Sequence, residues 1–218
     1  MCSSILVERS IVSLEQKRGR SMNKIDLLEL CREVKINNPA LLITRENGQK
    51  IYSVLQKRIE AIKESESPIM VIFPKNQLMD VSFADEVVIR IGQEVRMSRY
   101  GLGQGLILKG LGEDSIKNLD AAIKLQNLKI AFLVIRTSGE WDCIGQLEKN
   151  LRDTLNLLYE KEHLTALELV KQLGLAINTA STRLKRLYDL HLIKRDFEIT
   201  ENGLQYIYHF WNLEKNHD

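Results

Sequence analysis

The sequence has few of the residues that would mark an unusual class of protein. Of its 218 residues only three are proline and twelve are glycine, which excludes a fibrous or low-complexity chain. Its three cysteines lie far apart without a Cys-x-x-Cys pair, which argues against a disulfide framework and a cysteine zinc site. No apolar run approaches the ~18 residues of a membrane span. We therefore expect a cytoplasmic protein with free thiols.

The sequence also lacks a global excess of charge and has few histidines. Its 31 lysines and arginines nearly cancel its 29 aspartates and glutamates, so any nucleic-acid site must be a local patch. All four histidines lie beyond residue 160, which leaves the N-terminal part without a base for a serine or cysteine nucleophile. No His-Glu-x-x-His motif or Cys/His cluster is present. We expect no enzyme, no cofactor and no metal site.

Alternating strand and helix patterns predict an α/β domain at residues 22–136, after a flexible tail at 1–21. A helical pattern follows Met22 and ends near Val34. The further strands are expected at 41–44, 69–73, 106–108 and 129–135, and the further helices at 47–63, 82–97 and 114–126.

The pattern changes at 137–145, where we place the domain boundary, and a second unit follows at 145–218. Its order is helix, helix, glycine turn, helix and a short β-like hairpin, which is typical of a winged helix-turn-helix. The three helices are expected at 147–158, 165–173 and 178–190, the β-like stretch at 192–199, and a final helix at 204–213. The wing is expected to be short, with its tip at Asp196-Phe197.

Apolar spacing and local charge define a candidate DNA-binding surface in this unit. Leu167, Val170 and Leu173 are expected to face the core from the second helix. A stripe of Ile177, Ala180, Leu184 and Leu187 is expected to do so from the third. Residues 178–195 hold five basic residues and one acidic residue, a net charge of +4, whereas 147–218 holds ten and eleven, a net charge of −1. The predicted DNA-binding residues are Thr179, Ser181, Thr182, Arg183, Lys185, Arg186, Lys194 and Arg195.

The pattern Leu-x-x-Leu-x-x-x-x-Leu-Ile-Lys-Arg, from Leu184 to Arg195, and the following Ile199-Thr-Glu-Asn-Gly203 resemble winged-helix domains of bacterial transcription regulators. The resemblance implies double-stranded DNA as the partner. The alternative is a helical interaction domain with a solvated basic face, because many winged helices bind protein.

Two segments of the α/β domain, Thr44-Arg-x-x-Gly48 and Ser82-Phe-Ala-Asp-Glu86, lie at strand-to-helix junctions. On these motifs residues 41–135 resemble the STAS-like family, relatives of anti-sigma-factor antagonists. The resemblance implies a small mixed sheet backed by helices and a non-enzymatic protein that acts through regulated contacts with other proteins.

Ser82 falls at the position where anti-sigma antagonists are phosphorylated, but Asp80-Val81-Ser82-Phe83 lacks the first serine and the glycine of the family's Asp-Ser-Ser-Gly. The simpler interpretation is a capping box of Ser82 with Asp85, which stabilises the helix without any regulatory role. Arg45 is expected to pair with Asp85 or Glu86. As an alternative, it could hold an anionic ligand with the helix N-terminus.

The leading hypothesis is a DNA-binding transcriptional regulator with an N-terminal STAS-like sensing or assembly domain. The second is a partner-switching protein that binds other proteins through both domains. The third is a nucleotide-handling enzyme, although Gly101-Leu-Gly-Gln-Gly105 has neither the spacing nor the following helix of a nucleotide loop. We also expect a homodimer, because the apolar residues of the final helix would cover nearly its whole circumference. The alternative is that this helix packs wholly on the first winged-domain helix or on the STAS-like sheet.

Overall fold

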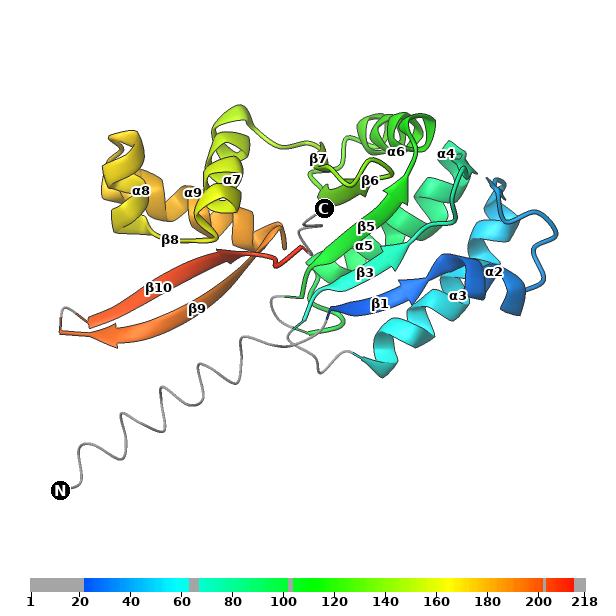
Figure 1. The fold of residues 1–218 in the computed structure, drawn as a ribbon, viewed down its shortest axis with the longest axis horizontal. Coiled ribbons are helices and arrows are strands. Elements are labelled where there is room, and N and C mark those ends of the chain that lie inside the picture. The colour runs from blue at the N-terminus through cyan, green and yellow to red at the C-terminus, as the bar shows by residue number, and fades with distance from the viewer. Residues whose placement is uncertain (1–21, 63–66, 102–103, 202, 214–218) are drawn as a thin grey trace, which may run out of the picture.

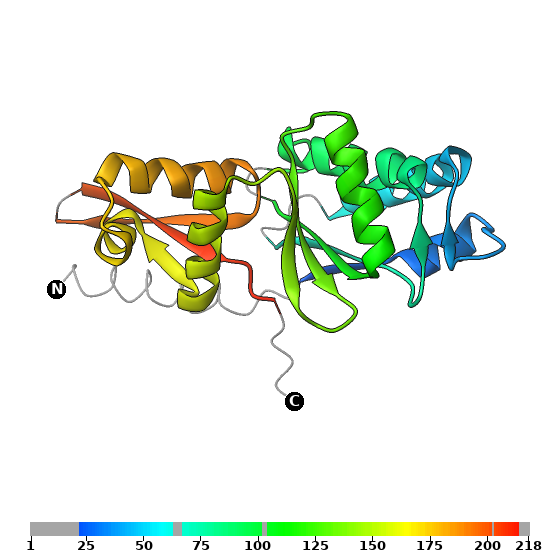
Figure 2. The same cartoon turned by 90° about the horizontal axis from the view of Figure 1, so that it is seen from above.

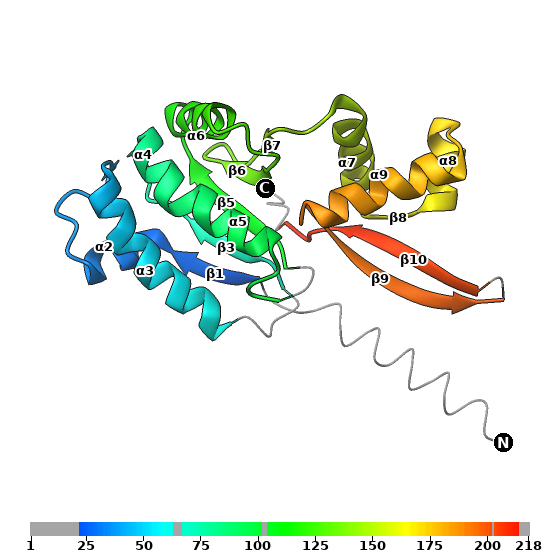
Figure 3. The same cartoon turned by 180° about the vertical axis from the view of Figure 1, so that it is seen from behind.

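The computed structural model describes residues 22–62, 67–101, 104–201 and 203–213. An α/β unit that extends to Gly145 is followed by a winged-helix unit (Figure 1). The winged-helix unit lies beside the end of the sheet at which the parallel strands begin, as the views from above and from behind also show (Figure 2 and Figure 3).

The α/β unit is built on a five-stranded mixed sheet in the order β1-β3-β5-β6-β7. Its fifth strand, β7 (Trp141–Gly145), runs antiparallel to β6. The parallel strands are β1 (Asn23–Asp26), β3 (Ile69–Ile72), β5 (Leu106–Leu111) and β6 (Ala131–Arg136). A mixed sheet with helices was predicted, and this architecture is confirmed.

Three strands differ from the prediction. β1 occupies the start of the expected first helix, which begins only at α2 (Leu27–Glu33), where the Asp26 side chain accepts the backbone N–H of Leu28. β7 lies beyond the last predicted strand, so the sheet reaches past residue 136. The predicted strand at 41–44 is reduced to β2 (Leu41–Leu42), which pairs with β4 (Leu78–Met79) outside the main sheet.

One face of the sheet is covered by helices (Figure 3). They are α2, α3 (Arg45–Ala61), the continuous segment of α4 (Val81–Phe83), π-helix η2 (Ala84–Ile89) and α5 (Arg90–Arg96), and α6 (Glu113–Leu125). Alternate strand residues point to opposite faces, so Val71 and Phe132 join the helical core. Met70 and Leu133 point the other way and join the core that continues into the winged-helix unit.

In the winged-helix unit, the described residues form three helices and a three-stranded sheet in the order β8-β10-β9. Its elements are α7 (Lys149–Lys161), β8 (His163–Thr165), α8 (Ala166–Leu173), α9 (Ile177–Asp189), β9 (Ile193–Thr200) and β10 (Gly203–Phe210). Helix α8 begins at a capping box formed by Thr165 and Glu168 and ends at the left-handed Gly174. The predicted helix-turn-helix order is confirmed.

The predicted final helix at 204–213 is wrong, because residues 203–210 form strand β10. Each of these residues lies opposite a residue of β9, from Gly203 opposite Thr200 to Phe210 opposite Ile193. The same pairing lengthens the wing, so Asp196 and Phe197 lie within β9 and not at its tip.

The core of the unit differs from the prediction at α8. Leu169 is its fully buried residue, whereas Leu167 and Leu173 are 56% and 40% exposed. On α9, Ala180, Leu184 and Leu187 are completely buried as predicted, but Ile177 at its start is exposed. The buried stripe fixes which side of α9 faces outward.

Candidate functional site

Helix α9 presents a polar face opposite its buried stripe. Ala180, Leu184 and Leu187 follow one another at helical spacing and lie on one side of the helix. Because that side is buried, the polar residues on the other side face outward. Five of the eight predicted DNA-binding residues are exposed on this helix, namely Thr179, Ser181, Thr182, Lys185 and Arg186. Hydroxyl groups and cations thus lie together on one accessible helix.

The exposed cations of this face already have acidic neighbours within the chain. Arg186 donates to both carboxylate oxygens of Glu148, which precedes α7, and its Nη1 lies 3.0 Å from Oε2. This pairing lowers the pKa of Glu148 and raises the pKa of Arg186. Lys185 pairs with Asp189 one turn further along α9. A phosphate that binds here must therefore compete with carboxylates.

The other three predicted residues are only partly exposed. Lys194 on β9 lies 3.1 Å from Asp196. Arg195 stacks against the rings of Tyr188 and Tyr206, at 4.2 and 4.3 Å from their centroids. Arg183 is half-buried, and its Nε is buried without a hydrogen-bond partner among the described residues. These three cations are thus less accessible than Lys185 and Arg186.

The C-terminal end of α9 contacts the α/β unit. His191, which has a left-handed backbone just after the helix, places Nδ1 2.7 Å from the carbonyl oxygen of Gln104. Gly105 lies directly under the ring of Trp211, where a Cβ would meet ring atoms at 2.7 Å. The His191 and Trp211 contacts connect the winged-helix unit to the α/β unit at Gln104 and Gly105, and the Arg186–Glu148 pair connects α9 to the residue before α7. No sequence motif predicts them.

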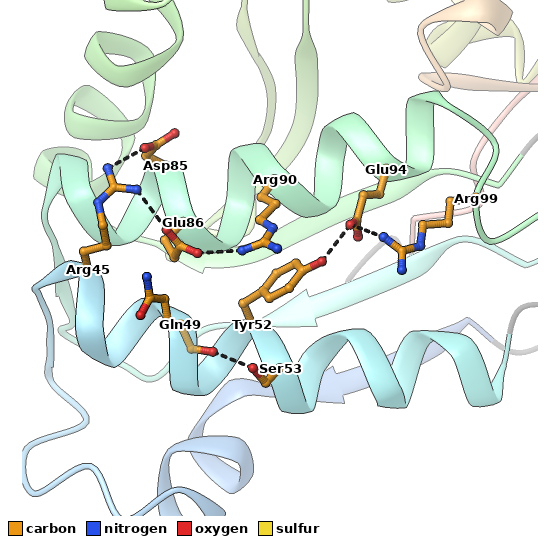
Figure 4. A network of polar contacts seen from close by, with 9 residues as sticks. All are labelled: Arg45, Gln49, Tyr52, Ser53, Asp85, Glu86, Arg90, Glu94 and Arg99. Atoms are coloured by element: carbon orange, nitrogen blue, oxygen red, sulfur yellow. Dashed lines mark hydrogen bonds and ion pairs between the residues drawn. The ribbon is translucent and has the colours of Figure 1, made fainter.

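The two motifs of the α/β unit are brought together by Arg45 (Figure 4). Its two terminal nitrogens lie 2.7 Å from the Asp85 carboxylate and 2.8 Å from the Glu86 carboxylate. The predicted pairing is confirmed, and the two carboxylates raise the pKa of Arg45. Glu86 lies in the π-helix and is only 7% exposed. Its carboxylate also binds the Arg90 guanidinium at a distance of 2.7 Å. Its charge is therefore shared by two arginines.

The network continues along the seam between α3 and α5 (Figure 4). The Arg90 guanidinium lies 3.7 Å from the centroid of the Tyr52 ring, and the Tyr52 hydroxyl donates to Glu94 at 2.6 Å. Tyr100 and Arg99 donate to the same carboxylate. Burial, assisted by Glu94, raises the pKa of Tyr52. Every carboxylate of the seam is thus bound by a side chain of this chain.

The predicted cap at Ser82 is wrong, because the cap of this helix is Asp80. One Asp80 oxygen accepts the backbone N–H of Phe83 at 2.7 Å, and the other accepts the N–H of Thr44 at 3.0 Å. Asp80 therefore joins the starts of α4 and α3, and Thr44 adopts a strained positive φ of 73° there. Ser82 lies half-buried within the first turn. Its phosphorylation stays a prediction.

Residues 147–194 match the family of winged helix-turn-helix DNA-binding domains. The match spans α7, α8 and α9 and ends at the base of the wing. No curated protein matches the chain. Within the described ranges, no helix is long and apolar enough to cross a membrane, and no group of three His, Cys, Asp or Glu side chains is placed to hold a metal ion.

Proposed function

We propose that the protein is a DNA-binding transcriptional regulator that reads duplex DNA with helix α9. The observation that carries the proposal is the exposed polar face of α9 within a segment matching the winged helix-turn-helix family. Lys185 and Arg186 would neutralise phosphates, while Thr179 and Thr182 would reach base edges in the major groove. No step of this function requires a cofactor or catalysis.

The α/β unit would act as a STAS-like sensing or assembly domain that contacts another protein. The proposal is supported by the Arg45 network, which joins the two segments on which that resemblance depends. A partner that engaged Arg45, Asp85 or Glu86, or a phosphate on Ser82, would disturb packing between α3 and the π-helix. The contacts of His191 and Trp211 offer a route from this unit to α9.

A second candidate function is partner switching without specific DNA binding. It is favoured by one observation, the neutralisation of Lys185 and Arg186 by Asp189 and Glu148. In this case the α9 face would dock another protein through its polar and ion-paired side chains. Contacts between this face and DNA phosphates would then contribute little to which partner the protein binds.

Selection of genomic fragments with the full-length protein separates the two functions. A DNA-binding regulator enriches fragments that share one motif, and a Thr182→Ala/Arg186→Ala variant loses that enrichment. Lys161→Ala removes one charge from the exposed end of α7 and should enrich the same motif as the wild type. Recovery of fragments without a common motif by the wild type contradicts sequence-specific binding.

A further inference from the structure

The distal half of the wing has an exposed apolar face. Phe197 and Ile199 on β9 are 64% and 83% exposed, and Leu204 and Tyr206 on β10 are 57% and 42% exposed. Phe197 lies opposite Tyr206 and Ile199 opposite Leu204 in the antiparallel register. Directly opposed residues share a face, so the four side chains form one patch, the wing face. Contiguous apolar patches of this kind mark interaction sites.

The wing face is the continuation of a buried surface. Ile193 and Tyr208 belong to the same face of β9 and β10 and lie in the core under the helices. Arg195, stacked between Tyr188 and Tyr206, marks the point at which helical cover ends. Beyond it the strands extend outward past the helices (Figure 1).

The charges of the wing do not suit DNA. Residues 196–206 contain Asp196, Glu198 and Glu201 but no lysine or arginine. Phosphates supply most of the affinity of a DNA interface, and three acidic residues would repel them. The wing face therefore fits a protein better than a duplex.

The placement of these charges suits a second copy of this chain. Strand alternation puts Asp196 and Glu198 on the opposite face from Phe197 and Ile199. Two wing faces can thus meet about a two-fold axis without burying or opposing carboxylates. The four side chains expose on the order of 500 Å² per copy, over half of the ~800 Å² that each partner contributes to a standard interface.

We propose that the protein self-associates through the wing face, with the wings of two copies packed face to face. This interface replaces the predicted final helix as the source of a dimer. Trp211, which lies within the range of that predicted helix, is buried within its own chain. The proposal does not depend on DNA binding, because association is measured without DNA.

Sedimentation velocity of the full-length protein over a micromolar concentration series tests the proposal. We expect a reversible dimer in the wild type, and a dimer dissociation constant at least ~10-fold higher in Phe197→Ser/Ile199→Ser. Glu198→Ser changes the opposite face of the same strand and should leave the dissociation constant unchanged. Both side chains of the double variant are mostly exposed, so its thermal midpoint should stay close to that of the wild type.

Two results overturn the proposal. One is a wild type that stays monomeric at every concentration. The other is a folded double variant that dimerises as well as the wild type, which would place the contact elsewhere. A fluorophore on Ile199→Cys, in a Cys2→Ser background, identifies a competing occupant. A monomer whose fluorophore responds only to added duplex would assign the wing face to DNA.

Discussion

Glu148 binds Arg186 through both carboxylate oxygens, which connects the residue before α7 to the exposed face of α9. Glu148 lies three residues after the end of the sheet at Gly145. A phosphate that captured Arg186 would release Glu148 at the junction between the two units. DNA binding and the geometry of this junction are therefore expected to be coupled.

Replacement of Glu148 by glutamine should raise DNA affinity several-fold, because Arg186 would no longer have to leave a carboxylate to bind phosphate. Fluorescence anisotropy with a selected duplex measures the change. Glu160→Gln removes the same charge from α7 at a position remote from Arg186, and it should have a much smaller effect. Equal gains in both variants would show that only net charge matters.

Gly48→Ala should destabilise the protein although alanine favours helices over glycine by about 1 kcal/mol. A Cβ at Gly48 would lie 2.9 Å from the Cβ of Glu86, so α3 and the π-helix would have to separate. We expect the free energy of unfolding to fall by roughly 1–3 kcal/mol in urea denaturation. Gln49→Ala, at the neighbouring exposed position, should change it little. A more stable Gly48→Ala protein would refute this close contact.

Asp80→Ala should reduce the free energy of unfolding by about 0.5–2 kcal/mol, since it removes the cap of α4 and the acceptor of Thr44 N–H. Ser82→Ala should cost less than Asp80→Ala, because Ser82 is not the cap. Thermal denaturation of the two variants shows which substitution reduces stability more. The reverse order would restore Ser82 as the capping residue.

Stability should fall at mildly acidic pH because of His209. Burial lowers its pKa in the folded protein, although Asp196 at 3.4 Å opposes this effect. The unfolded chain, with a histidine pKa of about 6.5, then binds the proton first. The free energy of unfolding is thus expected to decrease as pH falls from about 6.5 through the folded pKa, and to be unaffected by this residue above that range.

His209→Gln should flatten that part of the pH profile, measured by urea denaturation at a series of pH values. Identical profiles for the variant and the wild type would assign the dependence to a group other than His209.

The sequence predicted elements wherever a single periodic pattern dominated. The stripe of Leu147, Leu151, Leu155 and Leu158 indicated α7. Its last three residues are buried, whereas Leu147 is partly buried and lies before the helix begins at Lys149. The pairing of Arg45 with Asp85 and Glu86 was also predicted from the sequence. It could be, because both motifs lie where a helix begins after a strand, and the two helices start next to each other.

Prediction failed where pairing with another segment of the chain decides the structure. Residues 204–210 contain apolar side chains at almost every position, so helix and strand patterns are both satisfied, and β9 selects the strand by hydrogen bonding. The short, partly polar β7 carries no clear alternation and exists because it pairs with β6. Glu148 could not be identified as a partner of Arg186, since the two are 38 residues apart.

The salt dependence of binding to a selected duplex tests the central claim most directly. If α9 binds DNA, log K should fall linearly with log salt concentration, with a slope of about −0.9 for each phosphate neutralised. Arg186→Gln should reduce that slope by about one, whereas Thr182→Ala should keep the slope and cost roughly 1–3 kcal/mol on the preferred sequence only. Binding that is independent of salt, or a slope and preference unchanged in both variants, would contradict DNA recognition by this helix.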